Sequence, residues 1–219
     1  MKNNRLRTIA DMITPGMIVC DIGTDHAYLP LLLAQRGQND KIYAIDNKIG
    51  PLTQAKKTIE ENGMEDFIFP ILSDGLDKAP EDIQSVVIAG MGGEMILQIL
   101  EKIEDFKDIR EVIVQGNTSV QKIRQYISEH QYSILDEKTV YDYHYYTVIR
   151  FSLDKGRSLN EEEIWLGPVL METKEETFME YLKYRYYVLK SIDDAHTLND
   201  DTEYRMIRHF LAASHQIEE

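Results

Sequence analysis

Short apolar runs alternate with amphipathic stretches from residue 17 to about residue 150. This alternation is typical of consecutive βα units, which build a mainly parallel sheet covered by helices. The strands expected from the apolar runs are Met17–Ile22, Lys41–Asp46, Phe67–Leu72, Val86–Ala89 and Glu111–Val114. The helices expected from apolar residues at helical spacing are Ala27–Arg36, Gly50–Asn62, Gly93–Glu104 and Val120–His130. The sequence therefore predicts an α/β fold.

After the fifth expected strand the pattern changes. Ser133–Val140 and Tyr145–Ser152 both have the character of strands, and no helical stretch separates them. They predict an antiparallel hairpin. Five parallel strands finished by such a hairpin form the Rossmann-like sheet of class I methyltransferases. The terminal antiparallel pair distinguishes this sheet from that of a dehydrogenase.

The composition becomes strongly charged from about Leu153. Apolar residues recur at helical spacing between residues 178 and 189 and again between residues 206 and 211. A helical pair or short antiparallel coiled coil is expected, with a turn at Leu198–Thr202. We therefore expect a methyltransferase domain over residues 1–152 and a small α-helical, coiled-coil-like domain over residues 153–219.

The chain has 219 residues and a formal net charge of −14. This acidity is unfavourable for nucleic-acid binding, because phosphate contacts draw on Lys and Arg. Both expected domains are acidic, with 16 Lys and Arg against 23 Asp and Glu in residues 1–152 and 8 against 15 in residues 153–219. A local basic cluster, Lys2, Arg5 and Arg7, is either a phosphate contact or a solvated helix face.

Other features of the composition limit where the protein is expected in the cell and what it binds. No apolar run approaches the length of a membrane span, and the N-terminus lacks the apolar stretch of a secretory signal. A cytoplasmic protein is therefore expected. The one cysteine, Cys20, lies in an apolar run and is expected in the core. The sequence suggests no metal site, no membrane contact and no obligate protein partner.

The strongest local signal is the segment Asp21–Pro30, which follows the first expected strand and opens the first helix. Gly23 allows a tight turn and close approach of a ligand. The later glycines of a dinucleotide-binding loop are missing, since Asp25 and Ala27 occupy their places. A carboxylate would repel a pyrophosphate but tolerates the methionine end and sulfonium of S-adenosylmethionine. This departure favours S-adenosylmethionine over NAD, although Asp25 alone could be a helix N-cap.

The second expected strand ends in an acid, Asp46, and the third is followed by another, Asp74. Asp46 can accept hydrogen bonds from both ribose hydroxyls of an adenosine cofactor, and Asp74 can accept one from the exocyclic amine of its adenine. Each acid alone has an ordinary alternative, a capping residue for Asp46 and an Asp-Gly turn for Asp74. Three acids at three successive strand ends are the informative pattern.

The fourth expected strand leads into Gly90–Gly93, whose three glycines let the backbone lie flat against a ligand. The Asn-Pro-Pro-Tyr type of motif common in amino-group methyltransferases is missing here, so a different nucleophile is expected. The fifth strand ends in Gln115, Gly116 and Asn117, and such amides suit the Watson–Crick edge of a base. Asn117 has an equal alternative as the N-cap of the next helix.

Aromatic residues give weaker signals. The run Tyr141–Tyr146 could stack on a base, but cross-strand pairing within a hairpin is the more common role of such residues. His26, next to Asp25, could orient the methyl donor or touch the substrate, but a loop histidine is more often a hydrogen-bonded structural group.

In order and spacing, these motifs resemble those of the bacterial tRNA (adenine-22-N1)-methyltransferases, and the resemblance covers nearly the whole chain. It is carried by Asp21–Pro30, Gly90–Gly93, Gln115-x-Asn117 and Tyr145-Tyr146. The family has proline between the Gln and the Asn, where this chain has Gly116, which leaves the side chains in place but loosens the turn. The resemblance implies S-adenosylmethionine as the methyl donor and N1 of an adenine in the tRNA D-arm as the acceptor.

Adenine N1 has an available lone pair, so its methylation needs alignment and desolvation more than a strong base. Asp25 and Asn117 are the candidate catalytic residues, because an oxygen nearby stabilises positive charge that spreads onto the exocyclic amine. The candidate substrate-binding residues are Arg5, Arg7, Gln115, Asn117 and Tyr146. The candidate cofactor residues, from the loops and the resemblance together, are Asp21, Gly23, Thr24, Asp25, His26, Asp46, Asn47, Ser73, Asp74, Gly75, Gly90, Met91 and Gly92.

Two other functions are compatible with the same residues. A small-molecule methyltransferase is favoured by the acidic surface and disfavoured by the helical C-terminal part. A non-catalytic module that binds S-adenosylmethionine or RNA would keep the fold without turnover. The intact acids at all three strand ends argue against such decay.

Overall fold

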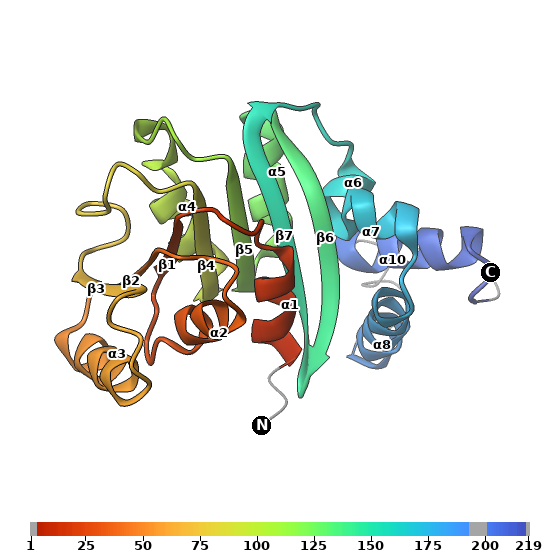
Figure 1. Cartoon of the computed structure of the whole chain (residues 1–219). Coiled ribbons are helices and arrows are strands. Elements are labelled where there is room, and N and C mark those ends of the chain that lie inside the picture. The colour runs from red at the N-terminus through yellow and green to blue at the C-terminus, as the bar shows by residue number, and fades with distance from the viewer. Residues whose placement is uncertain (1–3, 193–200, 218–219) are drawn as a thin grey trace.

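The computed structural model describes residues 4–192 and 201–217. Its strands are β1 (Val19–Ile22), β2 (Ile42–Asp46), β3 (Ile68–Leu72), β4 (Ser85–Gly92), β5 (Glu111–Thr118), β6 (Tyr132–Asp142) and β7 (His144–Lys155). They form one sheet in the order β3-β2-β1-β4-β5-β7-β6 (Figure 1). β1 to β5 are parallel, and β7 is antiparallel to both β5 and β6. The expected α/β sheet with a terminal hairpin is confirmed.

Helices cover both faces of this sheet. Ile9, Leu33 and Ile59, from the first three helices, belong to one buried cluster, whereas Ile96 and Ile127 belong to another. The apolar stripes predicted from helical spacing therefore pack on the sheet in two separate layers. The helices are α1 (Asn4–Met12), α2 (Tyr28–Arg36) and α3 (Ile49–Glu61) for the first cluster, and α4 (Gly93–Leu100), the short 3-10 helix η1 (Ile103–Asp105) and α5 (Val120–Glu129) for the second.

β4 and β5 are longer than the sequence predicts. They continue to Gly92 and Thr118 instead of ending at Ala89 and Val114, because their parallel pairing extends through the glycine-rich segment. Close approach at this point requires glycine, since a Cβ on Gly93 would lie 2.7 Å from the carbonyl oxygen of Thr118. Gly93, the first residue of α4, thus lets the start of this helix pack against the end of β5.

The hairpin is also longer than expected, since β6 begins at Tyr132 and β7 ends at Lys155. Its last residues are held by a hydrogen bond of 2.6 Å from Gly156 N to the Gln131 carbonyl. α4 is shorter than expected and ends at Leu100, where η1 follows after a turn. These differences change element lengths and leave the topology as predicted.

The C-terminal part is helical, as expected, and contains α6 (Glu161–Leu166), α7 (Pro168–Thr173), α8 (Glu176–Ile192) and α10 (Thr202–Ala213). The expected helical pair is present as α8 and α10, which share a third buried cluster in which the rings of Phe178 and Phe210 lie 6.0 Å apart. The short helices α6 and α7 were not predicted. Of the expected turn, residues 198–200 lie outside the described residues, and Asp201 caps α10 by accepting from Tyr204 N.

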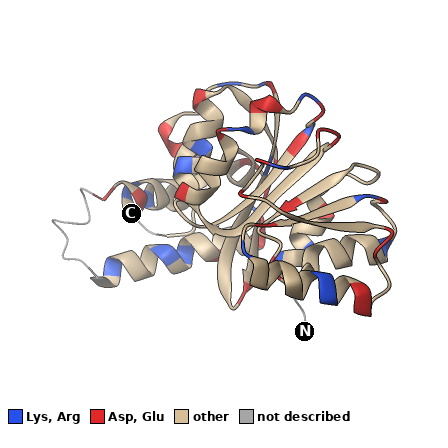
Figure 2. Ribbon diagram, turned by 90° about the vertical axis from the view of Figure 1, so that its left-hand side faces the viewer, with Lys and Arg blue, Asp and Glu red and all other residues tan. Residues whose placement is uncertain are grey.

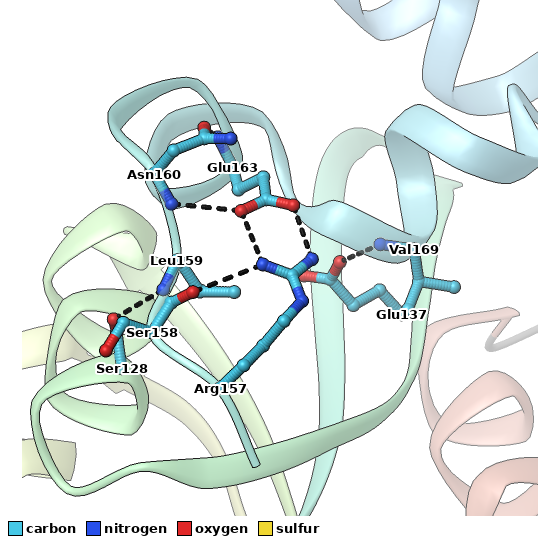
Figure 3. A network of polar contacts seen from close by, with 8 residues as sticks. All are labelled: Ser128, Glu137, Arg157, Ser158, Leu159, Asn160, Glu163 and Val169. Carbon is cyan, nitrogen blue, oxygen red and sulfur yellow. Dashed lines mark hydrogen bonds and ion pairs between the residues drawn. The ribbon is translucent and has the colours of Figure 1, made fainter.

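Polar contacts join the C-terminal helices to the rest of the chain (Figure 3). Leu159 N donates to Oγ of Ser128 in α5 at 2.8 Å. Arg157 pairs with Glu163, which together with Asn160 forms the capping box that begins α6. The linker and the start of α6 are therefore fixed locally.

A buried ion pair strengthens this attachment. Arg124 of α5 donates from Nε to Oε1 of Glu137 in β6 at 2.7 Å, and the two side chains are 3% and 0% exposed. The remaining oxygen of Glu137 accepts from Val169 N of α7 at 3.0 Å. Arg124 also donates to the carbonyls of Ile164 and Trp165 at the end of α6. One pair therefore connects α5, the hairpin, α6 and α7.

Acidic and basic residues are interspersed over the ribbon (Figure 2). Cys20 is fully buried, as expected from its apolar neighbours. Within residues 4–192 and 201–217, no helix is both long enough and apolar enough to cross a membrane.

Candidate active site

A cleft of about 400 Å³ lies at the carboxyl ends of β1, β2 and β3. This is the sheet edge at which open α/β folds bind their ligands. The predicted cofactor residues that line it are Gly23, Asp25, Asp46, Asn47, Ser73, Asp74, Gly75 and Met91. Of the other predicted cofactor residues, Asp21 and Thr24 are buried, and His26, Gly90 and Gly92 lie outside the lining. The three acids at three strand ends thus face one cavity.

The loop after β1 has an unusual backbone. Gly23 has a φ of +76°, and a Cβ on it would lie 2.1 Å from Cε of Met91. Asp25 and Ala27 also have positive φ, 52° and 57°, although both carry a Cβ. Such conformations persist where the surrounding structure holds them, and they cluster at ligand sites. α2 begins after Ala27 without a side-chain cap, so Asp25 is not its N-cap.

His26 packs within the same loop. Its ring stacks on Tyr28 with centroids 5.3 Å apart, and its Nε2 lies 3.7 Å from Oδ2 of Asp25. These contacts place the imidazole beside the carboxylate of Asp25 and outside the cleft lining.

Both oxygens of Asp46 are oriented by backbone donors. Oδ2 accepts from Asp25 N at 3.2 Å, and Oδ1 accepts from Lys48 N at 2.9 Å. Each carboxylate oxygen keeps capacity for a further hydrogen bond. The N-cap residue of α3 is Lys48, so Asp46 is not itself the helix cap. Its carboxylate is therefore fixed in direction while it lines the cleft.

Side chains also join the loops after β2 and β3. Asn47 donates from Nδ2 to Oδ1 of Asp74 at 3.2 Å. The Ser73 hydroxyl donates to the Gly75 carbonyl and accepts from Lys78 N, so it shapes the turn that carries Asp74. The interpretation of this segment as an ordinary turn is thus compatible with its interpretation as part of the cofactor site.

Asp21 is a buried carboxyl at the end of β1. Burial, with a contribution from the nearby Asp46 carboxylate, raises the pKa of Asp21 to about 6. An acid with this pKa changes its charge just below neutral pH, which is common near functional sites.

Polar side chains at the ends of β4 and β5 form a second part of the site. Gln115, fully buried, accepts through Oε1 from Arg5 at 2.5 Å and from Gly90 N at 3.2 Å. Its Nε2 donates to Oδ1 of Asn117 at 3.0 Å, and Asn117 Nδ2 donates to the Gly90 carbonyl at 2.8 Å. The Tyr146 ring lies 5.3 Å from the Arg5 guanidinium. We call these five residues, Arg5, Gly90, Gln115, Asn117 and Tyr146, the amide network.

The amide network has a buried and an exposed side. Gln115 is enclosed, whereas Asn117 is exposed and retains one free amide hydrogen and one carbonyl lone pair. Asn117 does not cap α5, whose N-cap residue is Ser119. Because Met91 of the cleft follows Gly90 directly, the network borders the cleft.

The predicted substrate residues are not all together. Arg5, Gln115, Asn117 and Tyr146 meet in the amide network, whereas Arg7 lies exposed on α1, apart from it. Lys2 of the basic cluster lies outside the described residues.

Sequence reasoning missed one wall of the cleft. Met95, Gln98, Ile99 and Lys102 line it from α4 and the turn after it. Met95 is 55% exposed, although the apolar pattern assigns it to a helix that packs on the sheet. A large apolar residue directly after the glycine turn was the available signal, because a cofactor's adenine needs an apolar surface.

The sheet order, the terminal hairpin and an acid-lined cleft at the switch point define a class I methyltransferase. The family model described as a methyltransferase domain matches residues 2–149. A tRNA (adenine(22)-N(1))-methyltransferase of Bacillus subtilis is 34% identical over 137 residues, which cover 62% of this chain and 58% of that protein. A putative tRNA methyltransferase of Mycoplasma pneumoniae is 30% identical over 197 residues, which cover 85% of this chain and 88% of that protein.

Similar solved structures point to the same family as these relatives. A putative tRNA (m1A22) methyltransferase of Streptococcus pneumoniae, in complex with S-adenosyl-L-methionine, has a TM-score of 0.88 at 27% identity, with 96% of this chain and 100% of that chain covered. TrmK of M. capricolum, in complex with S-adenosyl-homocysteine, has a TM-score of 0.78 at 34% identity, with 95% and 94% covered. The chain belongs to the tRNA (adenine(22)-N(1))-methyltransferase (TrmK) family.

Proposed function

We propose that this protein transfers a methyl group from S-adenosylmethionine to N1 of adenine 22 in the D-arm of tRNA, and that it acts in the cytoplasm. The observation that carries the proposal is the adjacency of two features, a cleft lined by acids from three strand ends and the amide network at its border. The first suits an adenosine cofactor and the second suits the edge of a base.

The cleft residues fit S-adenosylmethionine. The turn at Gly23 packs against Met91 of the cleft wall with no room for a Cβ, and the carboxylate of Asp46 is aimed by two backbone donors, as an acceptor for two ribose hydroxyls must be. Asp74, braced by Asn47, is an acceptor for the exocyclic amine of adenine. When bound, the cofactor supplies an electrophilic methyl group on a sulfonium. The carboxylates favour that positive charge.

The protein's own contribution to the chemistry is positioning. Asn117 can donate to or accept from the Watson–Crick edge of adenine, and Gln115 fixes its amide from the buried side. An oxygen of Asn117 or of Asp25 near the exocyclic amine would stabilise the positive charge that appears there as N1 is methylated. Neutral adenine N1 carries a lone pair, so no residue has to remove a proton before transfer.

We further propose that residues 153–219 hold the body of the tRNA. The supporting observations are the attachment of α6 and α7 through the buried Arg124–Glu137 pair and the contact of α8 with the hairpin, where the rings of Tyr181 and Tyr145 lie 5.5 Å apart. A rigid second part can hold the tRNA body while one base is exposed for reaction, at a cost of about a few kcal/mol for unstacking.

Transfer of a labelled methyl group separates this function from its rivals. The purified protein is supplied with labelled S-adenosylmethionine and either bulk unmodified tRNA or a mixture of small metabolites. We expect label in tRNA alone. Label in a small molecule would favour the small-molecule methyltransferase, and cofactor binding without transfer to either would favour the non-catalytic module.

A further inference from the structure

A second cavity, of about 530 Å³, lies between the end of β5, the hairpin and the C-terminal helices. Among the described residues it shares none of its lining with the cofactor cleft, but it includes Asn117 and Tyr146 of the amide network. A molecule held at the network therefore borders both cavities. The proposed function assigns an occupant only to the first.

Tyrosines form one wall and the entrance of the second cavity. Tyr145 of β7 and Tyr181 of α8 both line it, with ring centroids 5.5 Å apart. Tyr145 is also 5.0 Å from Tyr141 and 5.7 Å from Tyr184, which are 54% and 55% exposed. We call these four residues the tyrosine strip. It runs from the exposed surface of the hairpin and α8 into the cavity.

The rest of the lining suits a planar, uncharged heterocycle. Arg185 donates from Nε and Nη2 to both oxygens of Glu203, at 2.8 and 2.7 Å, so its guanidinium plane is fixed and the carboxylate is neutralised. Phe178, Leu182 and Ile207 add apolar surface from the third buried cluster. Aromatic rings and held Arg planes are the surfaces on which proteins stack unpaired bases.

We propose that this cavity binds an unpaired base of the tRNA that neighbours the methylated adenine in sequence. The proposal rests on the proposed function. An adenine whose N1 faces the cofactor cleft must lie at the amide network, and Asn117 and Tyr146 of that network belong to the cavity wall. The adjoining nucleotide is covalently tied to that adenine, so it is the planar group nearest to the cavity. Stacking it on Tyr145 holds the target strand open beside the cofactor.

Variants of the tyrosine strip test this site. We expect Tyr145→Ala and Tyr184→Ala to weaken tRNA binding and raise KM for tRNA about tenfold, because each variant removes an aromatic ring on which a base can stack. Tyr145→Phe should retain wild-type affinity, since it keeps the ring. The matched control is Tyr187→Ala, an exposed tyrosine of the same helix whose ring contact is with Tyr186. Unchanged S-adenosylmethionine affinity in calorimetry confirms that each variant is folded, and the exposed Tyr184 provides the test if Tyr145→Ala is unstable.

Abasic tRNAs identify the base. Full-length tRNAs that lack the base on the 5′ or the 3′ side of adenine 22 are compared with intact tRNA by binding to wild type and to Tyr145→Ala. One abasic tRNA should bind wild type about tenfold more weakly than intact tRNA does. The Tyr145→Ala variant should bind that abasic tRNA and intact tRNA equally well. Equal binding of all three tRNAs to wild type, or the same loss in Tyr145→Ala, would overturn the inference. If wild type shows the base-dependent binding but methylates no tRNA, the proposed function fails and the base site stands.

Discussion

Asp46 is not the helix cap that the sequence offers as its alternative role, but it organises the surrounding loops and also lines the cleft. Its oxygens accept from the backbone of Asp25 and Lys48, which is the behaviour of a loop-organising acid. The same carboxylate lines the cleft and keeps unused acceptor capacity. The structural role is therefore compatible with the proposed ligand role, because fixing a carboxylate in direction is what makes it a good partner for two ribose hydroxyls.

Replacing Asp46 should weaken cofactor binding. We expect Asp46→Ala to lower S-adenosylmethionine affinity by about 1.5–3 kcal/mol, since a charged acceptor of two hydrogen bonds is lost. Isothermal calorimetry measures it. The matched control is Asp82→Ala, which removes the carboxylate that pairs with Lys41 and lies outside the cleft lining. Equal affinities for wild type and both variants would refute the assignment of Asp46.

Asp21 predicts a pH dependence of stability. Its pKa in the folded state is about 6, above the usual 3.8, so the folded protein binds a proton more tightly than the unfolded chain. Stability is therefore greatest below pH 4 with respect to this group and falls as the pH rises from about 4 to about 6, by up to about 3 kcal/mol.

The Asp21→Asn variant isolates this effect. It should lack the decline between pH 4 and 6, so its free energy of unfolding relative to wild type should rise across that interval. Denaturant unfolding at a series of pH values measures the difference. A difference that stays constant with pH would show that Asp21 does not titrate in this range.

At the scale of elements, hydrophobic periodicity predicted the parallel strands, the hairpin and the helices between them. It could do so because buried faces repeat with the period of the element itself. The positions of Asp25, Asp46 and Asp74 at one edge of the sheet followed from that order, since the carboxyl ends of parallel strands lie together there. This is why the acids could be grouped before their geometry was known.

Other elements depend on contacts that periodicity does not encode. The extension of β4 and β5 rests on a close backbone approach at Gly93, and the α4 wall of the cleft depends on how that helix leaves the sheet. α6 and α7 are too short for a helical repeat to appear, and their position depends on Arg124 and Glu137, which the sequence separates. A buried arginine cannot be distinguished from a surface one without its partner.

The Arg124–Glu137 pair predicts a large cost for its removal. Glu137→Ala should lower the free energy of unfolding by about 3–5 kcal/mol, because it leaves a buried guanidinium and the Val169 amide without their acceptor. Arg157→Ala is the control, since Arg157 is 63% exposed in its pair with Glu163 and should cost about 1 kcal/mol or less. Urea unfolding compares the two. Similar small costs would show that the buried pair does not fix the C-terminal helices.

At the scale of the whole molecule, the net charge of −14 restricts where tRNA can bind. Arg5 is committed to Gln115 and Tyr146, so its loss should change the amide network as well as any phosphate contact. Arg7 is exposed on α1 and allows a cleaner test. If it contacts a phosphate, Arg7→Ala should reduce the log-log salt slope of tRNA binding by about 0.7–0.9 and leave S-adenosylmethionine affinity unchanged.

A salt series of tRNA binding measures that slope for wild type and for Arg7→Ala. Lys190→Ala on α8 is the comparison, because this lysine belongs to the proposed tRNA-binding part. Its ammonium group lies 5.5 Å from the Tyr186 ring centroid. An unchanged slope for Arg7→Ala with a reduced slope for Lys190→Ala would indicate that the phosphate contacts lie on the C-terminal helices and not at Arg7 of α1.

The most direct test of the proposed function is the position of the transferred methyl group. A full-length tRNA with adenine at position 22, and the same tRNA with guanine there, are incubated with the protein and S-adenosylmethionine. One portion of each product is digested to nucleosides, and another, left intact, is mapped by primer extension. We predict 1-methyladenosine and a stop at position 22 in the first tRNA, and neither in the second. A methyl group on another atom or nucleotide, or equal methylation of both tRNAs, would contradict the assignment of this chain as an adenine-22 N1-methyltransferase.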